Sequence, residues 1–172
     1  AAERGHAVTV FEAAPDEGGQ IRLTAQNPRR REMIGIIDWR MSQCAARDVV
    51  FHFNTWAEAE DVTALNPDVV IVATGGVPNM ELHETKGDVD LAVSAWDIIS
   101  GDVVPRGNVL IYDEAGDHPA LMAAEIAADA GCSVEVMTPD RTFAPEIMGM
   151  NLVPYMRALQ SKDVTFTVTR RL

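Results

Sequence analysis

The chain has 172 residues, 47% of them hydrophobic and 23% charged, which provides enough apolar surface for a folded core and excludes a disordered or disulfide-scaffold protein. Its net charge of −12 argues against binding to nucleic acid or to an anionic membrane, because phosphate groups would be repelled. The apolar stretches are far shorter than the ~20 residues of a membrane-spanning helix. Two distant cysteines, Cys44 and Cys132, predict unpaired thiols and a cytoplasmic location.

Short β-branched runs alternate along the chain with amphipathic or alanine-rich segments, so strands are predicted to alternate with helices. This order predicts an α/β fold of Rossmann-like parallel sheets. The strands are expected at Val8–Phe11, Val49–Phe53, Val69–Ala73, Val109–Tyr112, Val134–Met137 and Val164–Val168. The helices are expected at Arg31–Ala46, Ser94–Gly101, Pro119–Ala130 and Asn151–Gln160.

A segment without periodic pattern separates two subdomains. The stretch Val77–Asp90 contains Pro78, Gly87 and many charges, as connections do. We therefore interpret residues 1–80 and residues 81–172 as two subdomains.

An internal repeat relates the two subdomains, because residues 1–11 align without gaps on residues 127–137. Both copies read as the end of a helix, a glycine stop and a Val-x-Val strand, which is the second half of a βαβ unit. The later copy has its own first strand and turn, whereas the earlier copy begins inside the helix. We expect roughly 20 further residues upstream, containing a strand and a glycine-rich phosphate-binding turn.

The earlier copy carries a candidate nucleotide site. Glu12 directly follows the strand Val8–Phe11, where an acidic residue accepts hydrogen bonds from an adenosine ribose; the alternative is a solvated glutamate. Glycines let backbone approach a ligand closely, and small residues end the run Val69–Ala73. The predicted cofactor-binding residues are Glu12, Gly18, Gly19, Gln20, Ala73, Thr74 and Gly75, with neither a catalytic residue nor a metal ligand assigned.

The later copy has lost the features of a dinucleotide site. Its turn Asp113–Pro119 holds one glycine where GxGxxG has three, and three carboxylates that would repel a diphosphate. Thr138, which aligns with Glu12, is a poorer ribose partner. NAD(P)H is therefore not expected here, although Arg141 could pair with a 2′-phosphate. The other interpretation of the turn is an acidic helix start, with Asp117 or His118 as N-cap.

These motifs together resemble the C-terminal nucleotide-binding portion of the NADH:flavin oxidoreductases that carry an old-yellow-enzyme-like barrel. The group includes trimethylamine and histamine dehydrogenases, N-methyl-amino-acid demethylases and 2,4-dienoyl-CoA reductase, and the resemblance covers essentially the whole chain. It implies a longer protein with an N-terminal FMN barrel and a 4Fe–4S cluster, neither of which has matching positions here. It also implies the two-dinucleotide-domain arrangement of the glutathione-reductase type, truncated at its N-terminus. In that arrangement residues 1–80 are a partial FAD- or ADP-binding subdomain, and residues 81–172 are an NAD(P)-binding-like subdomain with a degenerate dinucleotide motif.

The degenerate later turn favours the amine-oxidising branch of this group, in which electrons pass to an electron-transferring flavoprotein. Two alternatives stay open: an NAD(P)H-dependent flavin or enoyl reductase, and a non-catalytic interaction module. The chain by itself is expected to be inactive, because the substrate site would belong to the barrel. Exposed sheet edges favour self-association. Trp39, Trp56 and Trp96 are expected to pack in cores or beneath loops.

Overall fold

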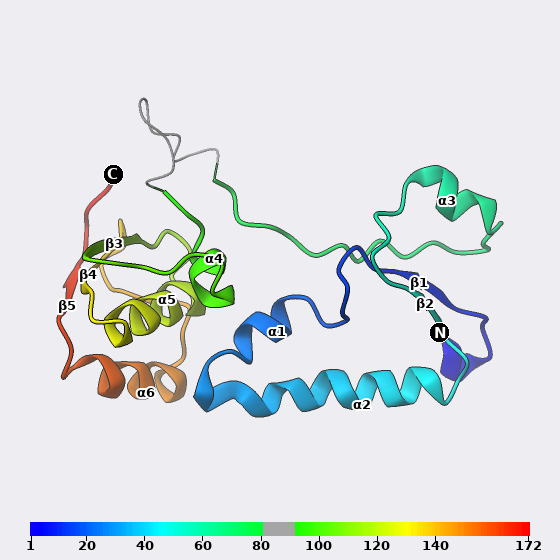
Figure 1. Cartoon of the computed structure of the whole chain (residues 1–172), viewed down its shortest axis with the longest axis horizontal. Helices are drawn as coiled ribbons and strands as arrows, with labels where there is room; N and C mark the ends of the chain where they lie inside the picture. The colour runs from blue at the N-terminus through cyan, green and yellow to red at the C-terminus, as the bar shows by residue number, and fades with distance from the viewer. Residues whose placement is uncertain (81–91) are drawn as a thin grey trace. The chain divides into compact units, whose positions relative to one another are not determined.

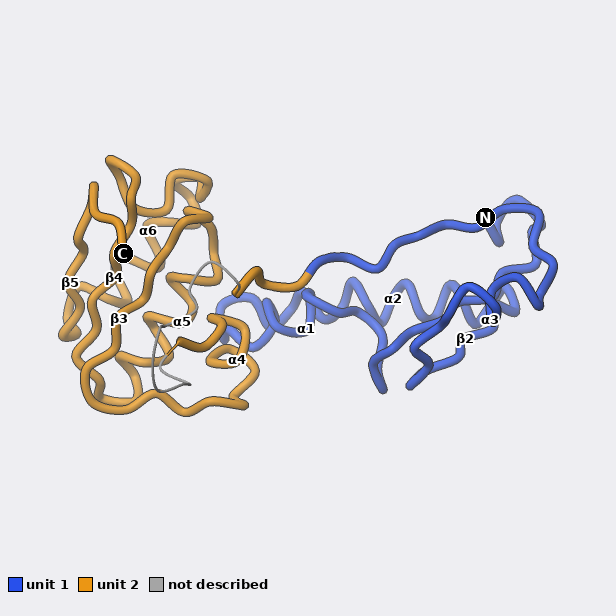
Figure 2. The backbone as a smooth tube through the Cα atoms, turned by 90° about the horizontal axis from the view of Figure 1, so that it is seen from above, with its two compact units in different colours: residues 1–76 blue, residues 77–172 orange. Residues whose placement is uncertain are grey.

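A computed structural model describes residues 1–80 and 92–172 of the chain (Figure 1). Its backbone contacts divide it into unit 1, Ala1–Gly76, and unit 2, Val77–Leu172, which Figure 2 shows in two colours. This division lies four residues before the predicted boundary after residue 80. Residues 81–90 of the predicted connection lie outside the described part.

Unit 1 is built on two short parallel strands, which form a two-stranded sheet. Two of its helices, α1 and α3, were not predicted from the sequence. The start of α3 has a readable signal, because Glu58 and Asp61 form a reciprocal capping box. The elements are η1 (Ala2–Arg4), β1 (Thr9–Phe11), α1 (Gln20–Thr24), η2 (Pro28–Met33), α2 (Ile34–Ala45), β2 (Val50–His52) and α3 (Ala59–Ala64).

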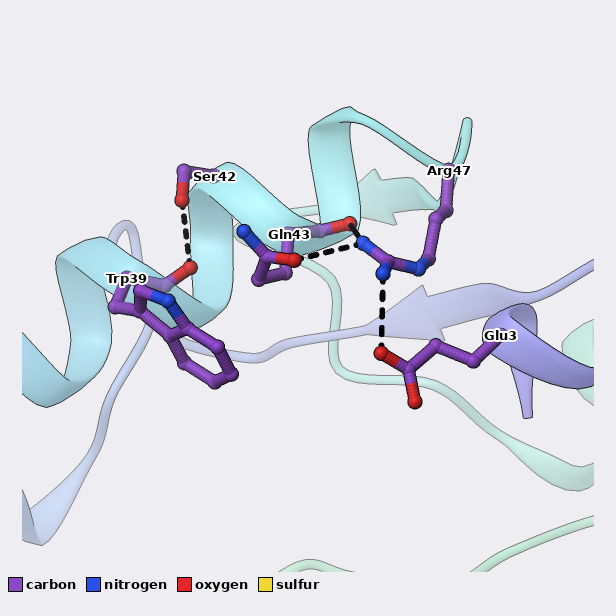
Figure 3. Close-up of polar contacts among 5 residues, drawn as sticks. All are labelled: Glu3, Trp39, Ser42, Gln43 and Arg47. Carbon is purple, nitrogen blue, oxygen red and sulfur yellow. Dashed lines mark hydrogen bonds and ion pairs between the residues drawn. The ribbon is translucent and has the colours of Figure 1, made fainter.

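Arg47 ties the end of the long helix α2 to the start of the chain (Figure 3). One of its guanidinium nitrogens donates to the carbonyl and the side-chain oxygen of Gln43, both at 2.9 Å, and the other bonds to Glu3 of η1 at 3.0 Å. Trp39, on the same helix, is 62% exposed, and Trp56 is 80% exposed. The prediction that these two tryptophans pack in cores is therefore wrong.

Unit 2 is a three-stranded parallel sheet in the order β3-β4-β5, with helix α5 packed on β3 and β4. Helices α4 and α6 pack in turn against α5 (Figure 1). The predicted strands and helices of this unit are all present, with bounds shifted by one or two residues. They are α4 (Ala95–Ser100), β3 (Asn108–Tyr112), α5 (His118–Asp129), β4 (Ser133–Met137), α6 (Gly149–Leu159) and β5 (Val164–Thr167).

The core of unit 2 lies between α5 and the sheet. Small side chains on α5 allow the helix to approach the strands closely, and Leu121 on the same helix is completely buried. The alternating pattern of β4 turns its valines to this helix. The buried cluster consists of Ala124, Ala127, Cys132, Val134 and Val136, with Ile111 and Phe166 among the side chains packed against it.

The repeat found in the sequence is also a repeat of backbone geometry. Gly5 and Gly131 occupy matching positions, with φ of 86° and 83°, a conformation that glycine adopts without steric cost. Each donates its N–H to the carbonyl three residues earlier, at 2.9 and 3.1 Å. The strands that follow pair in the same register, Val10 with Phe51 and Val136 with Phe166. Each unit thus contains the same half of a βαβ motif.

The segment Val69–Ala73 forms no strand in this structure, which contradicts the prediction. Its residues lie outside every sheet, and Val69, Ile71 and Val72 are 76%, 77% and 80% exposed. A buried parallel strand needs a neighbouring strand on which to form its ladder. Among the described residues, β1 pairs only with β2, so its other edge is open. The apolar run has the composition of a central strand but lacks a partner here.

This exposed run predicts that the chain self-associates. Each apolar side chain buried at a contact contributes about 1.5–3 kcal/mol, so replacing Val70 and Ile71 by lysine is expected to weaken association more than about tenfold. Sedimentation velocity over a range of concentrations would measure this. The matched control is Val104→Lys, which changes a valine outside this run that is 63% exposed. A chain that stays monomeric at every concentration would contradict the prediction.

Candidate nucleotide-binding site

The ends of β1 and β4 carry equivalent residues, Glu12 and Thr138. Each donates its N–H to the neighbouring strand, Glu12 to His52 at 2.9 Å and Thr138 to Thr167 at 3.0 Å. The side-chain oxygen of each then accepts the N–H two residues later, Ala14 at 2.9 Å in unit 1 and Asp140 at 3.2 Å in unit 2. The structure therefore places Glu12 where the repeat predicts it, at the carboxyl end of a parallel strand.

The loops beside these two positions repeat as well. Asn54 and Thr169 both have a left-handed backbone, with φ of 54° and 56°. Their N–H groups donate to the carbonyls of Ala14 and Asp140, at 3.0 and 2.8 Å. The two strand ends thus offer the same backbone cradle, and they differ in the side chain that enters it. Glu12 is half-buried and presents a carboxylate, whereas Thr138 is 1% exposed and presents nothing to a ligand.

The glycine turn of unit 1 lies against helix α2. Gly18 has φ of 105°, and a Cβ at this position would lie 2.2 Å from Cδ1 of the buried Ile37. A larger residue at this position would have a strained backbone and would require the Ile37 side chain to move. Gly19, with φ of 47°, is the N-cap of α1 and has open space where a Cβ would stand. A ligand could approach the backbone of Gly19 without obstruction.

The structure brings this turn next to the other predicted loop. Gln20, the first residue of α1, donates through Nε2 to the carbonyl of Gly76 at 3.4 Å. A Cβ built on Gly75 would lie 3.9 Å from the same Nε2. Ala73, Thr74 and Gly75 are all exposed, and Gly75 has φ of 71°. Of the seven predicted residues, Gln20 and Gly75 are therefore neighbours, while the bonds of Glu12 go to Ala14, His52 and Thr55.

A hollow of about 400 Å³ opens beside the glycine turn in unit 1. Two guanidinium groups line it, and one of them, Arg22, is paired with Glu17 at 3.2 Å. Arg31 is exposed at the other side. Asp16 also lines the hollow and Glu17 is paired with Arg22, so the two guanidinium groups are balanced by two carboxylates. Its lining residues are Asp16, Arg22, Ala25, Gln26, Arg31 and Ile34.

In the turn of unit 2, side-chain carboxylates accept hydrogen bonds from backbone N–H groups of the same turn. Oδ1 of Asp113, which is 4% exposed, accepts the N–H of Gly116 at 2.8 Å. Asp117 is the N-cap of α5 and accepts the N–H of His118 at 2.6 Å, which resolves the two N-cap alternatives in favour of Asp117. Arg141 is exposed. Sequence reasoning read Asp113 only as a repulsive charge and missed its bond, although an Asp three residues before a Gly is the pattern of such a turn.

Searches against known proteins reveal long relatives. No family model matches. The "Probable N-methylproline demethylase" of Rhizobium meliloti is 70% identical over 172 residues, which are 100% of this chain and 25% of that protein. The "N,N-dimethylglycine/sarcosine dehydrogenase" of Chromohalobacter salexigens is 41% identical over 172 residues, or 97% of this chain and 25% of that protein. These identities decide the relationship. The chain is a member of the NADH:flavin oxidoreductase group.

Two solved structures have a similar fold. The 6-hydroxypseudooxynicotine amine oxidase of Pseudomonas geniculata superposes with a TM-score of 0.79 at 27% identity, over 98% of this chain and 26% of its own. A 2-naphthoyl-CoA reductase superposes with a TM-score of 0.83 at 24% identity, over 98% of this chain and 25% of its own, and shows the same fold. The predicted α/β fold with Rossmann-like parallel sheets is thus confirmed. The chain spans about a quarter of the length of the curated relatives it matches.

Two further properties bear on this member of the oxidoreductase group. Within the described residues, no helix is long and apolar enough to cross a membrane. Cys44 is half-buried and Cys132 buried, and neither forms a disulfide.

Proposed function

We propose that the chain is the nucleotide-binding part of a longer flavoprotein that removes the N-methyl group from an N-methylated amino acid. The observation that carries this proposal is the 70% identity to a probable N-methylproline demethylase along the entire chain. The dehydrogenase relative at 41% identity acts, by its name, on two further N-methylated amino acids. The two names share one substrate class, a small amino acid with a methylated nitrogen.

In this proposal unit 1 holds ADP or FAD. The carboxylate of Glu12 would accept hydrogen bonds from the ribose hydroxyls. It already lies at the strand end, where its Oε1 accepts the N–H of Ala14. The open backbone at Gly19 and the adjacent loop at Gly75 would lie close to the bound nucleotide. The residues present fit a nucleotide, since they combine an acceptor for hydroxyls with backbone free of Cβ atoms.

The remaining redox groups belong, in this proposal, to the longer protein outside this chain. FMN would supply the two-electron oxidation of the amine, and a 4Fe–4S cluster would pass single electrons to an electron-transferring flavoprotein. The present chain would position its nucleotide and carry neither reaction, so we expect it to be inactive by itself. The free thiols Cys44 and Cys132 support a reducing, cytoplasmic location.

Anaerobic titration of the longer protein tests the proposal. N-methylproline is expected to bleach the flavin absorbance, whereas NADH and NADPH are expected to leave it unchanged. Proline is the matched control, because it differs only in lacking the methyl group that would be removed. Bleaching by NADPH together with no response to any N-methylated amino acid would contradict the proposal.

A reductase is the second candidate function, favoured by a different relative. The "NADH oxidase" of Thermoanaerobacter brockii is 31% identical over 138 residues, or 80% of this chain. The same titration separates the two candidates, because NADH or NADPH would bleach the flavin absorbance of a reductase. A non-catalytic interaction module is the third candidate, and it predicts neither bleaching nor binding of ADP.

A further inference from the structure

The strongest unexplained group outside the proposed site is the carboxylate of Asp113. It stands at the end of β3, where the turn to helix α5 begins, and its Oδ1 holds the N–H of Gly116 at 2.8 Å. The N–H of Ala115 also interacts with this carboxylate. In a nucleotide-binding unit, the N–H groups of this turn and the following helix point at a diphosphate. Here the N–H groups of the turn face the carboxylate of Asp113, which belongs to the chain itself.

This arrangement has an energetic cost, because the carboxylate of Asp113 is buried. Oδ2 of Asp113 is buried and accepts no hydrogen bond within the described part of the chain. Burial raises the pKa of Asp113 above its ordinary value; the N–H groups of Gly116 and Ala115 oppose this, and the carboxylates of Asp140 and Asp117 add to it. A group chosen for stability alone would be apolar or fully paired. We therefore look for the role of Asp113 in its contacts with the N–H groups of the turn.

A second segment closes the same turn from outside. A Cβ built on Gly116 would lie 2.6 Å from Cδ of Pro145, so the two segments of the chain are in direct contact. The N–H of Glu146 donates to the carbonyl of Gly116 at 3.0 Å. Ala144 and Ile147 on either side are 2% and 5% exposed. Residues 144–147 thus cover the turn at Gly116.

We propose that the Asp113 carboxylate is a built-in anion that occupies the turn in place of a diphosphate, and that it makes unit 2 refuse NAD(P)H and other nucleoside diphosphates. Asp113 is then the residue that excludes nucleotides from unit 2, a role separate from that of Glu12 in unit 1. This role is independent of the amine that the longer protein oxidises. Either inference can fail while the other stands.

Amide hydrogen exchange and ¹⁵N NMR on this chain test the proposal at Gly116. In the wild type, the Gly116 amide is expected to exchange slowly and to show no shift with NADH or inorganic pyrophosphate. Asp113→Gly removes the acceptor, so exchange is expected to quicken about tenfold or more, as the loss of a charge-assisted bond implies. Sodium formate, which replaces the deleted carboxylate, is expected to restore slow exchange, whereas sodium chloride is not.

Two variants control for charge and for folding. Asp113→Asn keeps the shape and an acceptor oxygen, so it is expected to fold, and the Gly116 amide proton is expected to shift upfield because the charge is lost. Glu114→Gln removes the adjacent charge, which bonds Tyr112 at 3.0 Å, and is expected to leave Gly116 unchanged. A saturable Gly116 shift with NADH or pyrophosphate in the wild type would overturn the proposal. So would a Gly116 amide that does not respond to Asp113→Asn, or Asp113→Gly exchange that formate does not slow.

Discussion

Replacing Glu12 by alanine is expected to weaken the binding of ADP to the longer protein about 10- to 100-fold, as the loss of a hydrogen bond to a charged acceptor implies. The carboxylate lies at the end of β1, half-buried, with one oxygen held by the N–H of Ala14 at 2.9 Å. It is therefore already oriented before a ligand binds, so that little entropy is lost on binding. Isothermal titration calorimetry measures the change directly.

Two variants make the Glu12 experiment specific. Glu12→Gln keeps an oxygen for Ala14 and the shape of the side chain but loses the charge, so its affinity is expected to fall between those of the wild type and Glu12→Ala. Thr138→Val changes the equivalent residue of unit 2, which is 1% exposed, and is expected to leave ADP binding unchanged. Equal affinity for Glu12→Ala and the wild type would remove the ribose assignment.

Replacing Leu121 by alanine is expected to lower the free energy of unfolding of unit 2 by about 2–5 kcal/mol. This side chain lies on α5, has no solvent exposure, and belongs to the helix on which α4, α6 and the sheet all pack. Its truncation removes buried apolar surface and leaves a cavity that several elements would have to fill. Met150→Ala on α6 is the control, since Met150 is 91% exposed and should matter by less than about 0.5 kcal/mol.

The tryptophans allow the two units to be followed separately in this experiment. Trp96 lies on α4 in unit 2, whereas Trp39 and Trp56 lie in unit 1. In a chain with Trp39→Phe and Trp56→Phe, urea denaturation monitored by fluorescence reports unit 2 alone. A loss below about 1 kcal/mol for Leu121→Ala would mean that α5 is not central to the core.

Local patterns were reliable where the interactions are local or pair within the chain. The strand at Val134–Met137 was predicted from alternating residues. It pairs with β3 on one side and with β5 on the other, so its backbone hydrogen bonds are formed within the chain. The cap at Ser94 and Asp97 and the glycine stop at Gly131 depend on a few adjacent backbone groups. The family could also be predicted, because the motifs that carry it are short runs in a recognisable order.

Patterns were misleading where burial depends on a distant partner. The run Val69–Ala73 reads as a central strand, but hydrogen bonds of a strand require a neighbour, and β1 offers its free edge to none of the described residues. Trp39 was expected in a core or beneath a loop because it lies in a helix-like segment, yet it is 62% exposed. Hydrophobicity predicts which residues can be buried, while only packing determines which ones are.

For the candidate site, the amino-acid order alone determined the strand end at Glu12, its repeat at Thr138, and the poverty of glycine in the turn before α5. Only the folded backbone showed that Gln20 reaches Gly76, that Asp113 bonds the turn from within, and that Pro145 covers Gly116. The reason is physical. A residue's place on a strand follows from its immediate neighbours, whereas the partner of a buried charge or of a bare backbone is brought to it by chain folding across many positions.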